Sequence, residues 1–404
     1  MSNKKSSAGN KGDNVRSDCY IELALRNTGE IKIDLKSKVE SMYGESIQEL
    51  IIDIFRFFNI KNAKIKIEDY GALPFTIAAR LETAIKRNSS EIKKEYLLPI
   101  NKKFQYKSTK QRLRRSRLYL PGNEPKYFIN AGLHKPDGII LDLEDSVAPN
   151  EKDSAQLVVR NALRSVNFYG SERMVRINQL PEGLTDLKYI VPHNVHVILI
   201  PKCEVADNVK RVDKEIARIL KIKNINTEIF LVPIIESALG VINSYEIASA
   251  SKNNCCLAIG LEDYTADIGT QRTIEGKESF YARSMVVNAA RAAGIQPIDT
   301  VYSDINNING LRESVLDAKA LGFEGKGCIH PRQVKVVHEA FAPGKDEIEN
   351  AKKIVLAFQQ AKKKGLGVVS VSSKMIDAPV VKRAQKTIEF AILNDLVSKN
   401  FRKE

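Results

Sequence analysis

A regular alternation of short apolar runs with longer amphipathic stretches, beginning near Arg117, is the feature that most constrains the fold of this chain. The runs have the length of buried strands, and the stretches between them have the length of helices. Eight runs are present, at residues 118–120, 138–143, 174–177, 195–200, 229–235, 257–260, 297–301 and 327–329. Repeated strand–helix units predict a parallel sheet covered by helices.

Eight such units in about 230 residues predict a closed (β/α)8 barrel, the TIM-barrel fold, rather than an open doubly wound sheet. The open sheet also lacks its usual dinucleotide signature, because no GxGxxG opens a helix in this sequence. We therefore expect an α/β barrel domain at residues 112–345, followed by a C-terminal helical lid at residues 346–404.

The residues before the barrel predict a small α+β domain at residues 1–87. The expected elements are strands at 19–25, 31–35 and 63–67, a helix at 46–58 and a strand or helix at 72–85. An Asn-Thr-Gly turn at 27–29 joins the first two strands. Residues 1–15 are rich in Ser, Gly, Lys and Asn, so we expect them to form a mobile tail.

Positive charge is concentrated between the two predicted domains. The chain carries a net charge of +14, and residues 86–117 supply +10 of it through twelve Lys or Arg against two acids. We predict that residues 88–111 form a basic linker that acts as a flexible tether. A polyanion such as RNA is an alternative partner for this segment. Its few aromatics, Tyr96, Phe104 and Tyr106, are unlike a base-stacking platform, which disfavours nucleic acid.

Composition excludes several other classes of protein. No stretch approaches the roughly 18 to 20 apolar residues of a membrane helix, and the N-terminus lacks the apolar centre of a signal peptide. The five cysteines form no CxxC pair, which favours unpaired thiols in a reducing compartment. We therefore expect a cytoplasmic protein with no membrane partner.

Charged and polar residues follow the predicted barrel strands at their carboxyl ends. These are Asp142, Glu144, Asp145, Arg176, Asn178, Lys202, Glu236, Glu262, Asp263 and His330. Any one of them alone is more simply explained as a helix cap or a solvated charge. Because the carboxyl ends of barrel strands meet at one rim, their repetition predicts a single cleft. Clustered carboxylates beside Arg176 and Lys202 suit a hard divalent cation and an anionic substrate, so we predict Mg²⁺ rather than zinc.

Nine segments of the barrel region together resemble a known family. They read LRRSRLYLPGNEP, DGIILDLEDSVAPNEKDSA, VRIN, IPKCE, IIESALGVIN, IGLEDY, YARSMVVNAARAAGIQPIDTVYSD, GFEGKGCIHPRQ and GLGVVSVSSKMIDAPVVKRAQ. In this order, over residues 112–390, they resemble the β subunits of bacterial citrate lyase, in the HpcH/HpaI aldolase and citrate lyase family.

The resemblance implies a TIM barrel that cleaves a 3-hydroxyacyl thioester with Mg²⁺. By that likeness Glu236 and Asp263 are the metal ligands and Arg176 is the catalytic arginine. The implied substrate-binding residues are Arg115, Glu144, Asp145 and Arg176. The implied reaction converts a citryl thioester to oxaloacetate and an acetyl thioester. Citramalyl and malyl thioesters stay open as alternative substrates.

The likeness also assigns a proton-transfer role to Asp377, within the lid. In the family this segment closes over the site of a neighbouring subunit. A plain helix cap ahead of Pro379 explains Asp377 equally well.

The small domain is similar to the γ subunit of the same enzyme, an acyl carrier protein. The resembling stretches are KIDLKSKVESMYGESIQELI, KIEDYGAL and ARLETAI. In that family a serine in an AG-x-x-E-S-[GS]-D segment carries a phosphoribosyl-dephospho-coenzyme A arm. The corresponding segment at residues 8–21 has Arg16 in the modified place and Ser17 beside it. Either the attachment site has shifted, to Ser17 in the first place and to Ser6 or Ser7 in the second, or the domain has lost its arm.

The resemblance further implies partners. We expect an acyl thioester substrate, bound to the carrier or to coenzyme A, and the α subunit of citrate lyase, an acyl transferase. A homo-oligomer, trimer or hexamer, is also implied. The chain would then be a fused γ–β subunit. A non-catalytic, polyanion-binding protein with a vestigial barrel is the alternative from another class.

Overall fold

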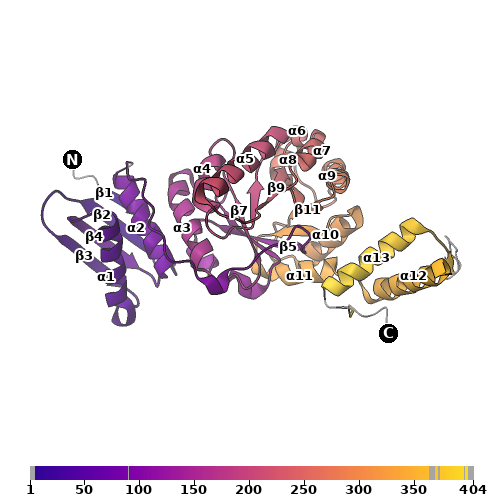
Figure 1. Ribbon diagram of the computed structural model, residues 1–404, viewed down its shortest axis with the longest axis horizontal. Coiled ribbons are helices and arrows are strands. Elements are labelled where there is room, and N and C mark those ends of the chain that lie inside the picture. Colours follow the sequence, from indigo (N-terminus) through magenta and orange to yellow (C-terminus); the bar gives the residue numbers. More distant parts are fainter. Residues whose placement is uncertain (1–4, 90, 364–368, 372–373, 395, 399–404) are drawn as a thin grey trace.

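The computed structural model describes residues 5–89, 91–363, 369–371, 374–394 and 396–398. Three parts follow one another along the long axis of the molecule (Figure 1). A small α+β domain lies at one end, a barrel lies in the middle, and a helical hairpin projects from the other end.

Eight parallel strands close into the central barrel, each hydrogen-bonded to the next in the chain and the last to the first. They are β5 (Ser116–Pro121), β6 (Gly138–Asp142), β7 (Glu172–Arg176), β8 (Val197–Ile200), β9 (Phe230–Ile235), β10 (Cys256–Ile259), β11 (Gln296–Val301) and β12 (Gly325–Cys328). Every predicted apolar run overlaps one of these strands, so the (β/α)8 barrel is confirmed.

Helices surround the barrel (Figure 1). They are α3 (Lys152–Ser165), α4 (Gly183–Ile190), α5 (Ala206–Lys223), α6 (Ala238–Ile242), α7 (Ser244–Ser249), α8 (Leu261–Asp267), α9 (Phe280–Ala292), α10 (Ile308–Leu321) and α11 (Pro331–Phe341). Short 3-10 turns lie at η1 (Lys102–Phe104), η2 (Pro125–Tyr127), η3 (Ala131–His134) and η4 (Pro149–Glu151).

Both faces of the barrel strands are buried, which explains their continuous apolar runs. In β6, Ile140 belongs to the apolar cluster inside the barrel, whereas Ile139 and Leu141 belong to the cluster between strands and helices. In β7, Met174 belongs to the cluster inside the barrel, and Val175 belongs to the cluster between strands and helices. A parallel strand covered on both sides favours large aliphatic residues at every position.

The small domain packs two helices on a four-stranded sheet. Its elements are β1 (Lys5–Ala8), β2 (Cys19–Leu25), β3 (Ile31–Ser37), α1 (Glu40–Phe57), β4 (Ala63–Asp69) and α2 (Pro74–Asn88). The strand order is β1-β2-β4-β3, with β3 parallel to β4 and the other pairs antiparallel. The two strands joined by the Asn-Thr-Gly turn are therefore not neighbours, because β4 lies between them.

Of the expected mobile tail, residues 1–4 lie outside the described residues, and residues 5–8 form a strand instead. Residues 5–8 form β1, which pairs with β2, and Ala8 is buried in the core of the small domain. Ser6 donates a 2.7 Å hydrogen bond to the carbonyl of Ala84 in α2. Edge pairing and one buried alanine are enough to order a segment whose composition is otherwise polar.

The prediction that residues 88–111 form a flexible tether is wrong as well. Residues 96–114, called the strap below, run across the amino ends of the barrel strands. Arg173, at the start of β7, donates hydrogen bonds to the carbonyls of Phe104 (2.9 Å) and Tyr106 (3.1 Å). The buried Arg114 forms a bidentate pair with Glu172, at 2.7 and 2.8 Å. The strap is thus fixed to the barrel by hydrogen bonds that its polar composition does not reveal.

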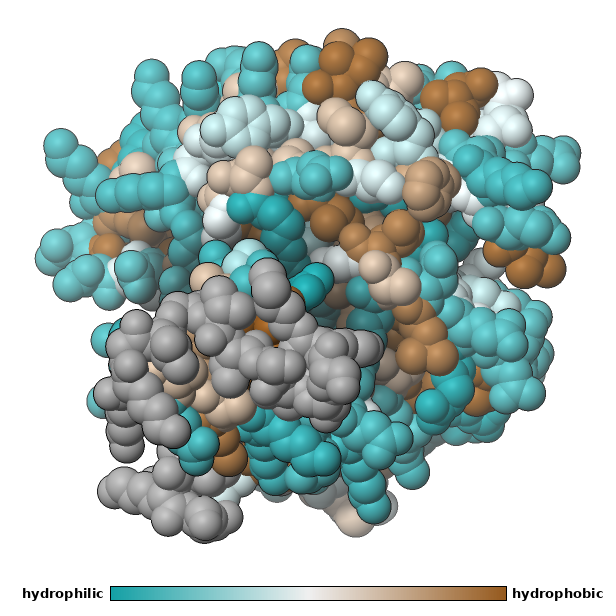
Figure 2. Space-filling model, turned by 90° about the vertical axis from the view of Figure 1, so that its right-hand side faces the viewer, coloured by the Kyte–Doolittle hydropathy of each residue, from teal (hydrophilic) through white to brown (hydrophobic). Residues whose placement is uncertain are grey.

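The chain ends in a helical hairpin of α12 (Lys345–Lys363) and α13 (Ala378–Leu393), with β13 (Val369–Val371) and β14 (Lys374–Ile376) between them. The two helices share an apolar cluster separate from the barrel core. Viewed from the hairpin end, separate groups of hydrophobic side chains lie among hydrophilic ones (Figure 2). Among the described residues, no helix is both long and apolar enough to cross a membrane.

Candidate active site

Four charged side chains from successive strands converge at the carboxyl end of the barrel. Asp142 and Arg176 are the last residues of β6 and β7. Lys202 follows β8 by two residues, and Glu236 comes directly after β9. The barrel brings together residues that are far apart in sequence because parallel strands end at one rim.

Arg176 is held by a buried carboxylate. Its Nε and Nη2 donate hydrogen bonds to the two oxygens of Asp142, at 2.7 and 2.8 Å. Burial alone would lower the pKa of the Arg176 guanidinium, but these hydrogen bonds raise it above its ordinary value. The guanidinium also lies 5.4 Å from the ring centre of Tyr119. Arg176 is therefore a permanently charged group in a fixed orientation.

Glu144 is a buried carboxylate without a hydrogen-bond partner among the described residues. Arg176 Nη1 lies 2.7 Å from its Oε2, but neither carboxylate oxygen receives a hydrogen bond. Burial raises the pKa of Glu144 to about 7, although Arg176 acts in the opposite direction. Asp145 beside it is more exposed, and its Oδ2 lies 3.3 Å from Arg176 Nη1.

Glu236 is 7% exposed and lies under the same rim. Its Oε2 accepts a 2.8 Å hydrogen bond from the backbone N–H of Lys202. A Cβ at Gly260 would lie 2.5 Å from Glu236 Oε1, so a glycine is required there for the carboxylate to fit. Burial, and after it the nearby Glu144, raises the pKa of Glu236 to about 8.

Lys202 lies among the carboxylates, as its position after a predicted barrel strand led us to expect, although the family resemblance gave it no role. Its Nζ lies 3.5 Å from Glu144 Oε1, 3.7 Å from Asp145 Oδ1 and 3.9 Å from Asp263 Oδ2. Its backbone has φ +47°, which is strained for a residue with a side chain. The IPKCE motif at the end of β8 was the signal that pointed to it.

The donor set fits a hard divalent cation by its chemistry. Glu144 and Glu236 are buried and have raised pKa values, so a neighbouring positive charge would favour their ionised forms. Carboxylate oxygens are the ligands that Mg²⁺ prefers. In the described part of the chain, no group of three or more Asp, Glu, His or Cys is gathered closely enough to hold a metal ion unaided.

Arg115 lies at the opposite end of the barrel, which contradicts its predicted role in substrate binding. It precedes β5, and its Nε and Nη2 form 2.8 Å hydrogen bonds with Asp137 ahead of β6. Its Nη1 contacts Asn394 at the end of α13. The motif LRRSR places Arg115 before the strand begins, whereas the site lies where the strands end.

Asp377 is not brought to this site within one chain. It caps α13, and its Oδ1 accepts a 3.2 Å hydrogen bond from the Val380 N–H. The contacts of α13 with the barrel, through Asn394 to Arg115 and Lys386 to Glu324, lie at the amino ends of the strands. The described residues of the hairpin therefore do not cover the carboxyl-end rim of their own chain.

Two further strand-end residues have the structural roles that we gave as the simpler explanation. His330 caps α11, where its Nδ1 accepts a 3.2 Å hydrogen bond from the Arg332 N–H. Glu262 pairs with Arg272. These contacts give neither His330 nor Glu262 a role in the candidate site.

Ser17 lies on the small domain, directly before the buried Asp18. Its N–H donates a 3.0 Å hydrogen bond to the carbonyl of Tyr70, and its side chain is half-buried. The loop of residues 9–18 that contains it faces the barrel loop after β5, since Asn10 Nδ2 lies 3.3 Å from Glu124 Oε1.

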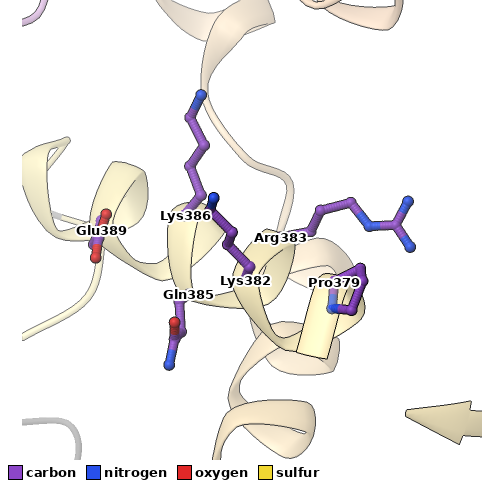
Figure 3. Close-up of a pocket in the computed structure, with 6 residues that line it drawn as sticks. All are labelled: Pro379, Lys382, Arg383, Gln385, Lys386 and Glu389. Carbon is purple, nitrogen blue, oxygen red and sulfur yellow. The ribbon is translucent and has the colours of Figure 1, made fainter. Parts of the chain in front are cut away.

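A pocket of about 510 Å³ opens beside the carboxylates. It is lined by Glu144, Asp145 and Lys202 from the rim and by polar residues of α3 and α4, including Gln156 and Asp186. A second hollow of about 580 Å³ lies over α13 and is lined by residues of that helix alone (Figure 3). Because none of the converging residues reaches it, we place the site at the first pocket.

Comparison with known proteins identifies both parts of the chain. Residues 115–331 match the HpcH/HpaI aldolase/citrate lyase family, and residues 6–88 match the family of the malonate decarboxylase delta subunit (MdcD). The citrate lyase subunit beta of Leuconostoc mesenteroides subsp. cremoris is 41% identical over 291 residues, which cover 71% of this chain and 96% of the relative.

Two further proteins are similar to this chain. The mitochondrial citramalyl-CoA lyase of Mus musculus is 33% identical over 290 residues, covering 69% of this chain and 86% of that protein. A crystal structure of CitE from Mycobacterium tuberculosis, in complex with magnesium, acetoacetate and coenzyme A, superposes with a TM-score of 0.59 at 27% identity. The superposition covers 70% of this chain and 99% of the CitE chain.

Proposed function

Because the chain belongs to the HpcH/HpaI aldolase/citrate lyase family and is a carbon–carbon lyase, we propose that it cleaves a citryl thioester to oxaloacetate and an acetyl thioester. The observation that carries this proposal is the convergence of Glu144, Asp145 and Asp263 around the Lys202 ammonium, beside the fixed guanidinium of Arg176. Glu236 joins them through the backbone N–H of Lys202. Such a rim can bind a substrate that is both anionic and metal-chelating.

The reaction requires one proton transfer at each end of the broken bond. The tertiary hydroxyl of the citryl group loses its proton, and its oxygen becomes the keto oxygen of oxaloacetate. The electron pair of the cleaved carbon–carbon bond passes to the α-carbon of the acetyl thioester as an enolate. A proton then adds to that carbon. The site must therefore stabilise negative charge and manage a proton.

Glu236 and Asp263 are the residues that would hold Mg²⁺. Bound there, Mg²⁺ would polarise the oxygens of the oxo-acid portion and stabilise developing charge. The solved CitE relative contains magnesium, which supports this assignment. Glu236 keeps its position through the Lys202 N–H and the space beside Gly260.

Arg176 would bind a substrate carboxylate or the oxyanion. Two of its nitrogens are occupied by Asp142, which fixes the plane of the guanidinium, and its Nη1 faces Glu144 and Asp145. We place these two carboxylates in substrate binding. The predicted proton transfer by Asp377 requires the hairpin of a second protomer, which fits the expected trimer or hexamer.

We further propose that the N-terminal domain is an acyl carrier fused in cis, with the phosphoribosyl-dephospho-coenzyme A arm on Ser17. Its match to a carrier-type family supports this assignment. The α subunit of citrate lyase is the proposed partner that would load the carrier, in a cytoplasmic complex.

An assay of the purified chain tests the lyase proposal. Citryl-, citramalyl- and malyl-coenzyme A are supplied separately with Mg²⁺, and oxaloacetate, pyruvate and glyoxylate are measured as the respective products. We expect oxaloacetate from citryl-coenzyme A at the highest kcat/KM. A higher kcat/KM for either of the other thioesters would contradict the citryl assignment, and absence of all three products would contradict the lyase function.

A further inference from the structure

Helix α2 of the small domain is buried on all sides. All eleven residues from Phe75 to Ile85 are buried. Ile77, Leu81 and Ile85 pack in the core of the small domain, whereas Phe75 and Ala79 belong to the apolar cluster of the barrel. A helix that is apolar on two faces requires a neighbour on each. Separation of the two domains would expose one of these faces to water.

Buried polar contacts strengthen the same interface. Arg160 of α3 forms a 2.7 Å ion pair with Glu82 of α2, and neither side chain is exposed. Asn161 donates a 3.1 Å hydrogen bond to the carbonyl of Phe75. These contacts have defined geometry, so they specify one orientation of the small domain on the barrel.

Arg80 of α2 connects the carrier loop, residues 9–18, to the barrel. Its Nε and Nη2 bind the two oxygens of Asp18, at 3.0 and 2.8 Å. Its Nη1 donates a 2.7 Å hydrogen bond to Ser154 of α3, and Nη2 donates a 2.6 Å hydrogen bond to the carbonyl of Asn123. The side chain is 1% exposed. One guanidinium thus fixes the residue next to Ser17 against two barrel elements.

The barrel loop that Arg80 contacts also reaches the active site. Asn123 follows Gly122, whose N–H donates a 2.8 Å hydrogen bond to the carbonyl of Asp142. A Cβ at Gly122 would lie 2.4 Å from that carbonyl, so the close approach depends on glycine. Asp142 in turn holds Arg176. The carrier loop is therefore docked at the carboxyl-end rim, where the site lies.

We propose that the N-terminal domain acts from this docked position and that Arg80 is a positioning residue for it. The domain stays in place, and only the prosthetic arm moves between the loading partner and the barrel. This inference rests on the proposed carrier function. It differs from a tethered, swinging domain because the interface stays closed during turnover.

Cross-linking tests whether the domain has to move. The variant Asn10→Cys with Glu124→Cys places two thiols at a contact between carrier loop and barrel loop. All five native cysteines are buried, so a short bismaleimide should react at the introduced pair. The protein is made in its own host so that the arm is attached, and mass spectrometry verifies the arm and the cross-link.

We expect the cross-linked protein to cleave its own carrier-bound citryl thioester within twofold of the uncross-linked double variant. A large loss of that activity, with cleavage of free citryl-coenzyme A retained, would show that the domain must undock and would overturn the proposal. A native chain without an arm would also overturn it. Free citryl-coenzyme A cleavage reports separately on the lyase function.

Substitution of Arg80 gives a second, independent measurement. In single-turnover experiments, Arg80→Met should slow cleavage of the carrier-bound thioester at least tenfold, and Arg80→Lys should recover part of that rate. The KM and kcat for free citryl-coenzyme A should stay within twofold. The control is Arg87→Met, on the same helix, which pairs with Asp153 at the exposed edge of the interface. Equal losses with both substrates would mean that Arg80 only supports folding.

Discussion

Two acidic residues at the rim, Glu236 and Asp263, are the proposed Mg²⁺ ligands, and we expect the same result from substituting either one. Glu236 is 7% exposed, while the side chain of Asp263 is 45% exposed. We expect Glu236→Gln and Asp263→Asn each to reduce kcat/KM at least a hundredfold, because each removes the charge of a proposed Mg²⁺ ligand. Stability should hardly change, since neither substitution alters side-chain volume.

The measurement combines steady-state kinetics at saturating Mg²⁺ with thermal unfolding. Glu262→Gln is the matched control, because Glu262 pairs with Arg272 outside the site. Near-normal turnover in either test variant would contradict the ligand assignment. A large fall in the unfolding midpoint would instead indicate that the residue supports the barrel.

Lys202 supplies a positive charge where the metal is proposed to act. Its Nζ lies 3.9 Å from Asp263, a proposed ligand, so the ammonium should compete with Mg²⁺ for that carboxylate and repel the metal ion. We predict that Lys202→Met tightens Mg²⁺ binding about tenfold, which corresponds to about 1.4 kcal/mol. Calorimetric titration with MgCl₂ measures it, with the exposed Lys214→Met as control. Weaker Mg²⁺ binding would mean that the lysine organises the ligands.

At the scale of elements, Asp377 can be tested without disturbing the helix it caps. Asn and Asp are equally good caps, whereas Ala costs about 1 kcal/mol of helix stability. If Asp377 transfers a proton, Asp377→Asn should lower kcat at least tenfold while leaving the unfolding midpoint unchanged. Full activity in Asp377→Asn would reduce the residue to its observed role as the cap of α13.

If Asp377 transfers the proton, the hairpin must act on a neighbouring protomer, because its described residues do not cover the rim of their own chain. Mixed oligomers of Asp377→Asn and Arg176→Ala chains should contain some sites with both wild-type residues. Activity should reappear on mixing, after subunit exchange has been verified by mass. Absence of recovery would place the proton transfer within one chain or on another residue.

The strap predicts a specific sensitivity to acid. His196 is buried beside Arg173 and Tyr106, and burial together with Arg173 lowers the pKa of its imidazole to about 3. The unfolded chain, with an ordinary pKa of about 6.5, takes up a proton first as the pH falls. The free energy of unfolding should therefore decrease between pH 6.5 and pH 3, by about 2 kcal/mol at pH 5 from this residue.

Urea unfolding at pH 7.5 and pH 5 measures the effect. His196→Asn retains an acceptor near Nδ1 but does not titrate. The difference in the free energy of unfolding between pH 7.5 and pH 5 should therefore be about 2 kcal/mol smaller in this variant. His134→Asn, at an exposed position, should retain the full difference. An unchanged difference in His196→Asn would show that the histidine is protonated in the folded state.

The sequence predicted the elements whose pattern is local. The barrel strands were found because burial on both faces leaves uninterrupted apolar runs, as at Ile139 and Ile140. Strand β1 was missed because Ser6 and Ser7 carry no apolar pattern and are ordered only by pairing with β2. The strap was missed for a related reason, since the arginine that binds its carbonyls, Arg173, lies about seventy residues away in sequence.

At the scale of the whole molecule, the shared helix α2 predicts that the two domains unfold together. The chain has no tryptophan, so one introduced tryptophan reports on one domain. Tyr43→Trp in α1 and Tyr245→Trp in α7 replace exposed tyrosines, each 55% exposed. We expect their unfolding midpoints in urea to coincide.

Phe75→Ala should lower both midpoints, because the side chain of Phe75 fills the core between the domains. The expected loss in the free energy of unfolding is about 3 to 5 kcal/mol. Separate midpoints in the parent variants, or a shift in only one of them, would show that the domains are independent.

The site was only partly accessible from sequence. The strand ends predicted that Arg176, Glu236 and Asp263 lie at one rim, and the structure brings them together there, because the rim of a barrel collects the residues that follow its strands. Arg115 was placed wrongly, since a position before a strand and a position after it look alike in a run of basic residues. The position of Lys202 after a strand placed it beside the carboxylates, but no local pattern of side chains reveals its left-handed backbone.

The order of the two domains has a consequence during synthesis on the ribosome. The small domain is complete at residue 88, but α3, which covers the outer face of α2, ends only at Ser165. At ordinary elongation rates Phe75 and Ala79 lack their barrel contacts for on the order of ten seconds. During that interval the nascent chain presents an apolar helix face to chaperones and proteases. Slower translation of residues 89–165 should therefore lower the yield of intact protein.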